Sequence, residues 1–466
     1  FSSFLTVLGA VFPPVASIMF VDYWILKRSR KVLDESRAHG KLPEEAEKFP
    51  VVTIVTWVTS VALGYVIKWG IQSINVLVFS GIIYYVGMKL FDKKKTAFEV
   101  ETRCKQIATG AALLGSGGGG NPYIGKMMAI SAVKEHGPVT LMSPSEAADD
   151  AFFVSASMIG APAVSMEKFP NGSEFERSFE MFEKYCGKKI YGTFPVEAGG
   201  INSMMPIVAA AKMNLPVLDV DGMGRAFPEL QMSTFVLAGH QVTPMVLTDE
   251  RGNTSLVNTV DSVWAEKIGR NITVQMGASS TSASDAMTAK ELREAGVVNI
   301  ITFCQNIGKL IQHAKDFKST KEALNKLLEY TNGFRLMSGK IVDISHVTEG
   351  GFNYGTTTIQ GLDEDDGLEG KISFQNENII MRVNDQVLAT APDLIMMIDT
   401  DTLQPVTNEE ARYGKRVHVI GLPANEKWRT PAGIKLVGPR YFKYDVDYIP
   451  IEERYADYQG KKGEVQ

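Results

Sequence analysis

Two apolar runs near the start of the chain constrain its fold more than any other feature. Residues 51–67 and 71–91 are long enough for helices that cross a bilayer, which takes roughly 17–25 residues. A further apolar run, residues 1–26, precedes them. We therefore expect residues 1–91 to form membrane-spanning helices. The alternative is a pair of buried core helices in a water-soluble domain.

Basic residues that flank these runs predict their orientation. Residues 27–31 read KRSRK and residues 93–95 read KKK, and short loops rich in Lys and Arg stay on the cytoplasmic side of a membrane. The connector around Lys68 is then outside, and everything after Lys95 lies in the cytosol. We predict a multi-pass membrane protein, embedded in the lipid bilayer, with its soluble domains on the cytoplasmic side.

The rest of the chain has the composition of a globular protein. The chain of 466 residues is 45% hydrophobic and carries a net charge of −5, so no basic stripe exists for nucleic acid and none is expected as a partner. Cys104, Cys186 and Cys304 are widely spaced and form no CxxC pair, as expected in a reducing cytosol. The chain begins at Phe1 rather than Met, so we expect a fragment of a longer protein or a processed product.

Changes of pattern predict the domain organisation. Residues 92–98 form a short basic linker, and residues 99–265 alternate helical and strand patterns, as an α/β domain does. Residues 266–455 begin with an expected strand at 272–276 and then become rich in short strands. They predict a β-rich, sandwich-like α+β domain. Residues 456–466 are a tail.

The stretch GSGGGGNPYIGK at residues 115–126 has the outline of a phosphate-binding loop. No nucleotide is expected there, because Met127 replaces the hydroxyl that binds magnesium and Pro122 removes an N–H donor. A helix starting near Tyr123 would still point its N–H groups at the loop, which suits an anion or a polarised carbonyl. The alternative is a tight packing turn. As part of a site, the loop is expected to form a pocket wall that faces the Asp219–Asp221 strand end. The predicted substrate-binding residues of this loop are Gly117, Gly118, Gly119, Gly120 and Asn121.

The stretch richest in candidate site residues, 215–232, begins with an apolar strand that ends in two acidic residues. Strand periodicity puts Asp219 and Asp221 on one face, at the carboxyl end of a strand, where sites in α/β sheets gather. Two close carboxylates share a proton or hold a cation, so both are predicted as catalytic and as ligands of a divalent metal. Arg225 and Glu229 follow closely in the sequence and place further charged side chains near the two aspartates, so both are also predicted as catalytic. In the alternative, the aspartates cap the following turn and Arg225 pairs with one of them.

Two further motifs offer weaker candidates. PVEAGGINS, residues 195–203, places Glu197 and Asn202 around a Gly-Gly turn at a helix start. MGASSTSASDA, residues 276–286, offers Ser279 and Ser280, although most hydroxyl-rich loops of this kind are only turns. We predict Glu197 as catalytic and the other three as substrate-binding.

The N-terminal segment resembles a family of transporters. GAVFPPVASIMFVDYWILKRSR, residues 9–30, and the two apolar runs after it resemble the late helices of the cytosine/purine/uracil/allantoin/hydantoin permeases, nucleobase–cation symport family 1. The transport site of that family lies in earlier helices. The resemblance therefore implies that this segment transports nothing by itself.

The soluble part resembles a second family, through the motifs LLGSGGGGNPYIG, EAGGINSMMP, DVDGMGRAFPELQM, FQNENI, PDLIMMID and VGPRYFKYDVDY. Over residues 99–453 it is similar to the DUF917 or S-methyl thiohydantoin desulfurase family. That resemblance implies an α/β domain followed by a β-rich one, and hydrolytic removal of sulfur from a thiohydantoin ring. A metal-activated water, on zinc, is the mechanism we expect. Members often stand beside hydantoinase/oxoprolinase-type proteins, which implies such a partner.

Both resemblances point to a small cyclic amide or ureide as the substrate. We predict a hydrolase of hydantoin-, thiohydantoin- or lactam-like rings, attached to the remnant of a permease. Glu229 or Glu197 would move protons, and the glycine loop would hold the ring. One alternative is a domain that binds such a ligand and regulates the carrier without chemistry. Another is an artificial join of neighbouring genes. We also expect a homo-oligomer.

Overall fold

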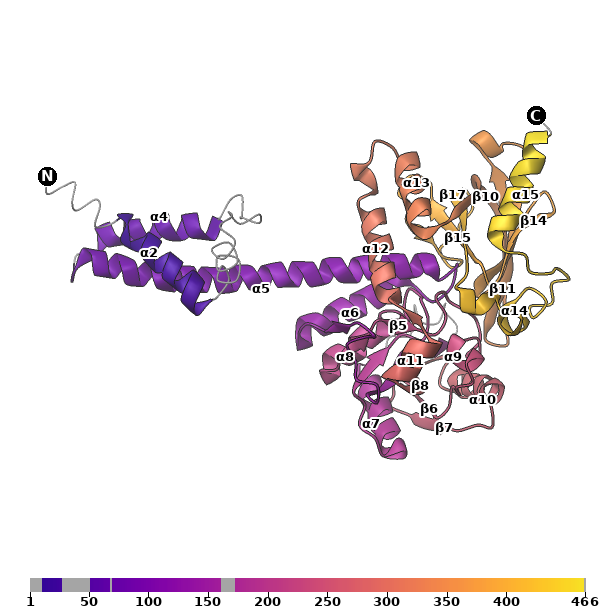
Figure 1. The fold of residues 1–466 in the computed structure, drawn as a ribbon, viewed down its shortest axis with the longest axis horizontal. Helices are drawn as coiled ribbons and strands as arrows, with labels where there is room; N and C mark the ends of the chain where they lie inside the picture. The colour runs from indigo at the N-terminus through magenta and orange to yellow at the C-terminus, as the bar shows by residue number, and fades with distance from the viewer. Residues whose placement is uncertain (1–10, 27–50, 68, 161–171, 465–466) are drawn as a thin grey trace. The chain divides into compact units, whose positions relative to one another are not determined.

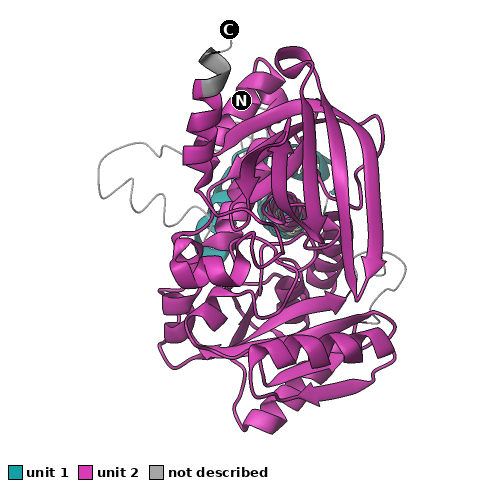
Figure 2. Cartoon of the chain, turned by 90° about the vertical axis from the view of Figure 1, so that its right-hand side faces the viewer, with its two compact units in different colours: residues 1–99 teal, residues 100–466 magenta. Residues whose placement is uncertain are grey.

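The computed structural model describes residues 11–26, 51–67, 69–160 and 172–464 (Figure 1). The chain divides into two compact units, Phe1–Glu99 and Val100–Gln466 (Figure 2), and each is described by itself. The basic cluster at residues 27–31 and the connector residue Lys68, on which the predicted orientation depends, lie outside the described residues.

The first unit is built from apolar helices. It contains α2 (Pro13–Phe20), a π-helical turn η1 (Val21–Ile25), α4 (Val51–Val66) and the start of α5 (Gln72–Leu114). Of the described helices, one segment, Gln72–Leu90, has the length and hydropathy of a membrane span, and α4 is shorter at 16 residues. The membrane location therefore stays a prediction. The predicted linker at 92–98 is helical and falls inside α5.

A seven-stranded sheet forms the first half of the second unit, with the order β1-β4-β3-β2-β8-β6-β7. Its strands are β1 (Leu141–Met142), β2 (Phe152–Gly160), β3 (Gly192–Phe194), β4 (Val217–Leu218), β6 (Met245–Thr248), β7 (Thr254–Val257) and β8 (Ser279–Thr288). Strands β1, β4, β3 and β2 run parallel, whereas β8, β6 and β7 pair antiparallel. The parallel half fits the predicted α/β domain.

Helices pack around this sheet, alternate with its strands along the chain and continue after β8. They are α6 (Pro122–His136), α7 (Glu174–Cys186), α8 (Met205–Met213), α9 (Thr234–Leu237), α10 (Ser262–Gln275), α11 (Ala289–Ala295), α12 (Ile300–Gln312), the 3₁₀ turn η3 (Ala314–Asp316) and α13 (Thr320–Thr331). Helix α8 is almost entirely buried and packs on α6, β2 and β3. A small ladder pairs β5 (Val220–Asp221) with β9 (Val297–Val298).

The strand predicted at residues 272–276 is wrong, because these residues end α10. The Asp261 side chain accepts a hydrogen bond from the Trp264 N–H at 2.9 Å and caps the start of this helix. The run of β-branched residues Ile272, Thr273 and Val274 favours a strand locally, but it continues a helix that is already capped and packed.

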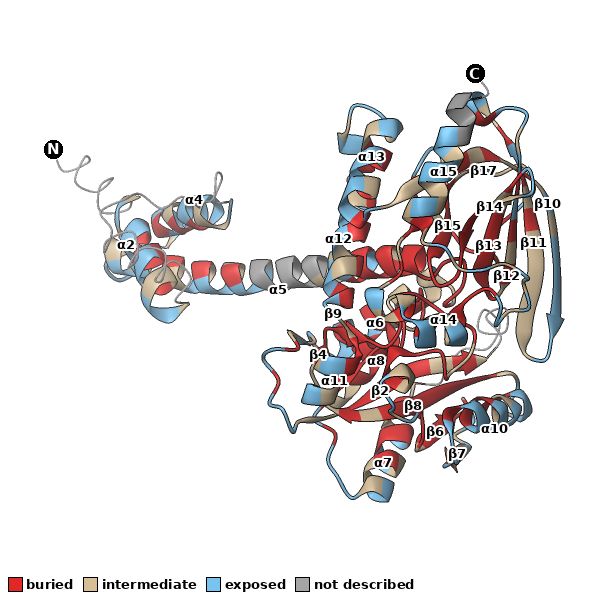
Figure 3. Cartoon of the chain, turned by 45° about the vertical axis from the view of Figure 1, so that its right-hand side comes forward, coloured by how far each residue is buried: buried red, intermediate tan, exposed pale blue. Residues whose placement is uncertain are grey.

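The second sheet has eight antiparallel strands in the order β14-β13-β12-β11-β10-β17-β15-β16. They are β10 (Phe334–Glu349), β11 (Phe352–Gly361), β12 (Glu369–Gln375), β13 (Glu377–Val383), β14 (Gln386–Thr390), β15 (Leu394–Asp399), β16 (Pro405–Val406) and β17 (Arg416–Leu422). Strands β13 and β14 also contact β15, so one sheet curves back over a single core, where two facing sheets were expected. Figure 3 shows β2 and β8 of the first sheet and β13, β14 and β15 of the second as mostly buried, whereas β10 and β11 are largely intermediate or exposed.

Short helices complete the second unit. They are the 3₁₀ turns η4 (Asp363–Asp365) and η5 (Glu426–Arg429) and the helices α14 (Pro431–Val437) and α15 (Ile451–Glu464). The predicted tail from residue 456 is helical as far as Glu464. Strand β8 pairs with β2 and β6 of the first sheet, so that sheet takes a strand from beyond the predicted boundary at residue 265.

Candidate active site

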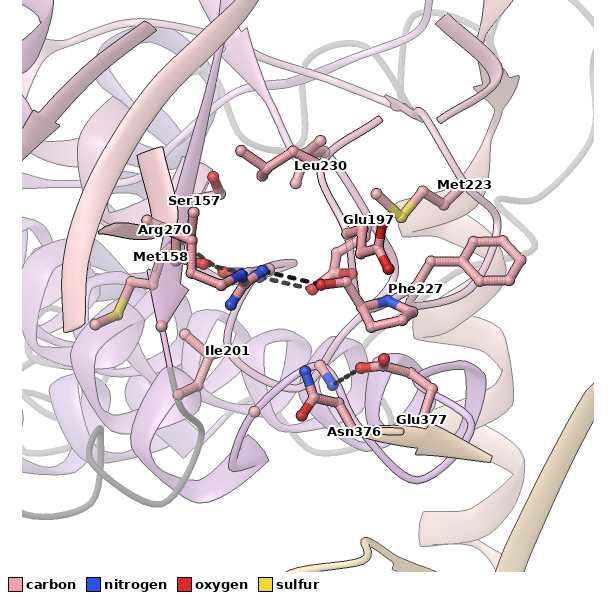
Figure 4. Close-up of a pocket in the computed structure, with 18 residues that line it drawn as sticks. Ser157, Met158, Glu197, Ile201, Met223, Phe227, Leu230, Arg270, Asn376 and Glu377 are labelled. Atoms are coloured by element: carbon pink, nitrogen blue, oxygen red, sulfur yellow. Dashed lines mark hydrogen bonds between the residues drawn. The ribbon is translucent and has the colours of Figure 1, made fainter. Parts of the chain in front are cut away.

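A pocket of about 90 Å³ lies where the carboxyl ends of β2 and β3 meet the turn between β12 and β13 (Figure 4). Ligand sites of α/β sheets gather at this end of parallel strands. The lining residues are Gly119, Gly120, Ser157, Met158, Ile159, Gly160, Val196, Glu197, Ile201, Asn202, Met223, Phe227, Pro228, Glu229, Leu230, Arg270, Asn376 and Glu377. Figure 4 shows Met158 and Arg270 on one side, with Glu197 and Glu377 across from them.

Two glycine turns pack backbone to backbone beside this pocket. A Cβ on Gly119 would lie 2.5 Å from the Cα of Gly199, and one on Gly200 would lie 2.4 Å from the Gly120 carbonyl oxygen. The Ile201 N–H donates to the Gly119 carbonyl at 2.9 Å. Gly119 and Gly120 also have φ of +73° and +82°. Side chains would clash at this contact, so the glycine run and the EAGGINS motif form one structure.

Asn121 begins helix α6 immediately after the glycine run. Its side-chain oxygen accepts hydrogen bonds from the N–H groups of Tyr123 at 2.9 Å and Ile124 at 3.3 Å, and Pro122 takes the first helical position. The predicted helix start is therefore confirmed. Asn121 itself does not line the pocket, because its side chain is used as the cap.

Glu197 lies three residues beyond the end of β3 and is buried. Asn202 Nδ2 donates to its Oε1 at 2.6 Å, and Asn202 Oδ1 accepts the Met158 N–H at 2.8 Å, which ties the carboxyl to the end of β2. Burial raises the pKa of Glu197 to about 7, although Asn202, the Phe227 N–H and the charge of Arg225 each lower it. Such a carboxyl exchanges a proton readily near neutral pH.

Glu377 opens β13 and reaches the glycine loop from the antiparallel sheet. Its Oε1 accepts the Gly119 N–H at 3.2 Å, and a Cβ on Gly118 would lie 2.1 Å from the same oxygen. Its Oε2 is buried and has no hydrogen-bond partner within the described parts of the chain. Burial, and then the charge of Glu197, raise the pKa of Glu377 well above its usual value, against Arg225 and the Gly119 N–H.

Arg225 is a buried cation beneath these carboxyls. Its guanidinium packs over the Phe227 ring at 4.4 Å. Its hydrogen bonds go to the backbone carbonyls of Ala226, Asn378, Pro392 and Asp393. Burial lowers its pKa to about 10, while the charges of Glu377, Asp393 and Glu197 oppose that shift. Arg225 therefore acts on the pocket through its charge.

Arg270, from helix α10, lines the pocket directly. It forms an ion pair with Glu266 and donates to the carbonyls of Pro228 at 3.0 Å and Gly351 at 3.3 Å. Its guanidinium also lies 4.2 Å from the Phe352 ring. These contacts fix the side chain and leave part of its five-donor fork for a ligand carbonyl.

Asp219 and Asp221, the predicted metal ligands, do not line the pocket. Asp219 accepts the N–H groups of Ile301 at 2.7 Å and Thr302 at 3.3 Å, and the Thr302 hydroxyl at 2.5 Å, at the start of α12. Asp221 accepts the Gly224 N–H at 2.8 Å. Burial raises the pKa of both carboxyls. Asp221 caps the following turn, as the alternative proposed, whereas Asp219 caps the distant start of α12. Arg225 bonds to backbone carbonyls instead of pairing with an aspartate.

The aspartate pair does not fit a bound metal in this geometry. N–H and O–H donors point at both carboxylates, and a cation would have to face the same donors. Among the residues that the structure describes, no group of three or more His, Cys, Asp and Glu side chains could hold a metal ion. Metal binding therefore stays a prediction.

The other predicted residues divide between the pocket and the scaffold. Glu229 lines the pocket and accepts hydrogen bonds from Gln231 and from the Tyr441 hydroxyl, the latter at 2.7 Å. Ser279 and Ser280 lie in β8 outside the lining. Gly117 and Gly118 do not line it either, but they leave room for Asn378 and Glu377 to approach the loop.

Several lining residues were missed by the sequence analysis, chiefly Ser157, Met158, Arg270, Asn376 and Glu377. The FQNENI motif contained two of them, but nothing local distinguishes its glutamate from those of any other polar turn. The glycine loop was expected to face the Asp219–Asp221 strand end. Instead it faces Glu377, which lies 258 residues away from Gly119 in the sequence.

The fold and the pocket together indicate the class of protein. Two buried carboxyls with raised pKa, an arginine and a backbone-lined glycine turn surround a small cavity. This combination is typical of enzymes that carry out acid–base chemistry on small molecules.

The chain belongs to the S-Me-THD-like family, because the model of its N-terminal domain matches residues 102–259 and that of its C-terminal domain matches residues 260–451. This family points to a hydantoin-related enzyme function. It confirms the predicted family of the soluble part and leaves the permease resemblance a prediction.

A solved structure supports the fold. A crystal structure of a protein from Chromobacterium violaceum superposes with a TM-score of 0.64 at 23% identity, and it covers 76% of this chain and 99% of its own. At this identity the likeness shows the fold alone. A search of curated proteins gives no match.

Proposed function

We propose that this protein is a hydrolase of small hydantoin- or thiohydantoin-like rings and that Glu197 is its general base. The observation that carries the proposal is the position of Glu197, which lines the pocket at the carboxyl end of β3 with a pKa of about 7. A base is most effective when its pKa lies near the working pH. Membership of the S-Me-THD-like family supports the class of ring.

The proposed reaction needs only water as a second substrate. Water bound beside Glu197 attacks the ring carbon that carries the sulfur or the amide nitrogen, and the carboxylate takes one proton as the new C–O bond forms. The C–S or C–N bond then breaks, and the leaving sulfur or nitrogen receives that proton from Glu197. The second water proton, on the new hydroxyl, passes to the ring nitrogen when sulfur leaves and stays on the new carboxylic acid when the ring opens. The products are a ring carbonyl and a thiol, or an opened ring, and no oxidant or reductant is required.

The pocket walls suit a small, partly apolar ring. Met158, Ile201, Phe227 and Leu230 supply apolar surface, which excludes water and strengthens electrostatic interactions inside the pocket. Arg270 offers N–H groups on the side opposite Glu197. We propose that the ring packs on the apolar wall and directs a carbonyl toward Arg270.

A substrate series tests this function. The full chain, purified in detergent, is incubated with hydantoins, S-methyl thiohydantoins and five-membered lactams, and the products are identified by mass spectrometry. We expect turnover of at least one ring class that Glu197→Gln abolishes. Binding of a ring without turnover would contradict the enzyme and support the ligand-binding alternative.

Metal assistance is a separate part of the proposal, for which no ligand set is assigned. Metal analysis of the purified chain, with activity measured before and after a chelator, tests it. Activity that survives complete metal removal would contradict metal assistance without affecting the role of Glu197.

We also propose that the first unit lies in a membrane, as the end of a permease-like domain. Helices α4 and α5 expose large apolar side chains, among them Val55, Val58, Ile74 and Ile82, which a bilayer would cover. Fractionation of cells that express the full chain tests this. Release of the protein by alkaline carbonate would contradict it.

A further inference from the structure

We propose that Glu377 works as a neutral carboxylic acid, whose Oε2–H donates a hydrogen bond to the substrate atom on which negative charge develops. The proposal rests on the function proposed above. It gives a role in that reaction to Glu377, a carboxyl that the second sheet contributes to the pocket. It also explains why so many glycines precede helix α6.

The two oxygens of Glu377 have different surroundings. Oε1 accepts the Gly119 N–H at 3.2 Å, as the carbonyl oxygen of a carboxylic acid would. Oε2 is buried and has no partner within the described residues, and the side chain lines the pocket with only 3% of the residue exposed. A buried polar atom left unpaired costs about 1–3 kcal/mol, so this oxygen is expected to meet a ligand or a water.

The charges around the pocket favour a neutral Glu377. Glu197 and Glu377 are both buried, and the buried cation Arg225 gives its hydrogen bonds to backbone carbonyls, so it acts on the two carboxyls through its charge alone. If both were ionised, one buried negative charge would be left without compensation. Burial and the charge of Glu197 raise the pKa of Glu377 well above its usual value. Asn202 and the Phe227 N–H both donate to Glu197 and favour its ionised form, whereas only the Gly119 N–H donates to Glu377, so we place the proton on Glu377.

A neutral acid at this position complements the base. When water adds to the ring carbon, the oxygen, sulfur or nitrogen bonded to that carbon gains negative charge. An O–H group directed at that atom stabilises the charge, and an ionised carboxylate would repel it. The O–H bond of Glu377 stays intact, so proton transfer is left to Glu197. Carboxyl groups held neutral by apolar surroundings serve as donors in this way in other enzymes.

The glycine run makes the position possible. A Cβ on Gly118 would lie 2.1 Å from Glu377 Oε1, so any other residue there would displace the carboxyl. Gly119, at φ +73°, turns its N–H toward the same oxygen. With Oε1 held by that N–H, Oε2 is left to carry the proton.

Two substitutions separate a neutral donor from an ionised carboxylate. Glu377→Gln keeps the shape, a carbonyl for Gly119 and an N–H donor, and should retain kcat/KM within about tenfold. Glu377→Met keeps the length and removes the donor, and should lose about 10²–10³-fold, as removal of one such donor does. If Gln loses as much as Met, an ionised carboxylate is needed and the proposal fails. If Met retains full activity, it fails as well.

Infrared difference spectroscopy tests the protonation state without turnover. At about pH 8, wild type minus Glu377→Gln should show the C=O band of a protonated carboxyl, and the exposed Glu453→Gln should show no such difference. A carboxylate band in place of the acid band would overturn the proposal even in an active enzyme. An acid band in a protein that converts no ring would leave a neutral Glu377 standing and sink the proposed function.

Discussion

The second unit buries two pairs of carboxyl groups near the carboxyl ends of its parallel strands, and the two pairs have different partners. Asp219 and Asp221, beside β4 and β5, are surrounded by N–H and hydroxyl donors that hold α12 and a tight turn in place. Glu197 accepts hydrogen bonds from the Asn202 side chain and the Phe227 N–H, and Glu377 accepts one from the Gly119 N–H. Both carboxyls line a cavity. Burial raises the pKa in all four.

The difference teaches that burial and a raised pKa do not by themselves mark a site. A carboxyl whose oxygens already accept backbone N–H groups is part of the scaffold. One with an oxygen directed into a cavity has capacity left for a ligand. We therefore propose that the aspartates serve stability and the glutamates serve chemistry, and the following experiments test that division.

The largest expected effect separates Glu197→Gln from Asp221→Asn. Loss of a general base lowers kcat/KM by about 10²–10⁴-fold, so Glu197→Gln should do so with little change in melting temperature. Asp221→Asn keeps an oxygen for the Gly224 N–H and should leave kcat/KM within a few-fold. Steady-state kinetics on both variants measure this difference. A larger loss of kcat/KM in Asp221→Asn than in Glu197→Gln would favour a catalytic role for the aspartates.

A glycine substitution tests whether the pocket depends on backbone contact. Gly119→Ala places a methyl 2.5 Å from Gly199 at a φ of +73°, so strain and overpacking together should cost about 2–5 kcal/mol. Gly187→Ala is the matched control, because its φ is also positive, at +64°, but its Cβ meets nothing within 4 Å. Urea unfolding measures both. Equal losses would mean that the contact with Gly199 is not tight.

A cap deletion should affect stability alone. Asp219→Ala removes the acceptor for Ile301 and Thr302, and we expect a loss of about 1–2 kcal/mol in the free energy of unfolding. Ser319→Ala, which caps α13 through the Glu322 N–H, serves as the control on a helix outside the pocket. Activity per folded molecule should be unchanged in both. A selective loss of activity in the Asp219 variant would favour a metal or catalytic role.

The smallest expected effect, about tenfold per pH unit, is the pH dependence set by Glu197. Since the base must be ionised, kcat/KM should fall below pH 7 and level off above it. The folded state also binds this proton more tightly than the unfolded chain, whose carboxyl titrates near 4.5. Its contribution to stability is therefore greatest below pH 4.5 and is lost as the pH rises to about 7. Glu197→Gln should remove the acid limb of kcat/KM and only the share of the stability change that Glu197 contributes, since burial also raises the pKa of Asp219, Asp221 and Glu377. A persistent acid limb would identify another base.

Features set by neighbouring residues could be predicted from the sequence. Asn121-Pro122 marked the start of α6, and Gly137 marked its end, because helix caps depend on a few adjacent side chains. The alternation of helices and strands likewise indicated the parallel half of the first sheet. Glu197 was selected because it precedes a Gly-Gly turn at an expected helix start, and it does line the pocket.

Features set by distant residues could not be predicted in this way. Glu377 becomes a site residue only because β13 brings it against Gly118 and Gly119. Asp219 carried a strong local signal, but its donors come from α12, more than eighty residues later, and they turn it into a cap. Residues 272–274 show the same limit, because a cap at Asp261 and packing of α10 override their preference for strand.

The position of strand β8 has a consequence for how the chain is made. The two family domains meet at residues 259 and 260, yet the first sheet is completed only by β8, residues 279–288, which lies between β2 and β6. During synthesis on the ribosome, the earlier strands must therefore wait with open edges until this segment emerges, a period in which they are exposed to wrong pairing. Expression of the two family domains as separate genes, divided at residue 259, would leave one half with an incomplete sheet and the other with an unpaired strand.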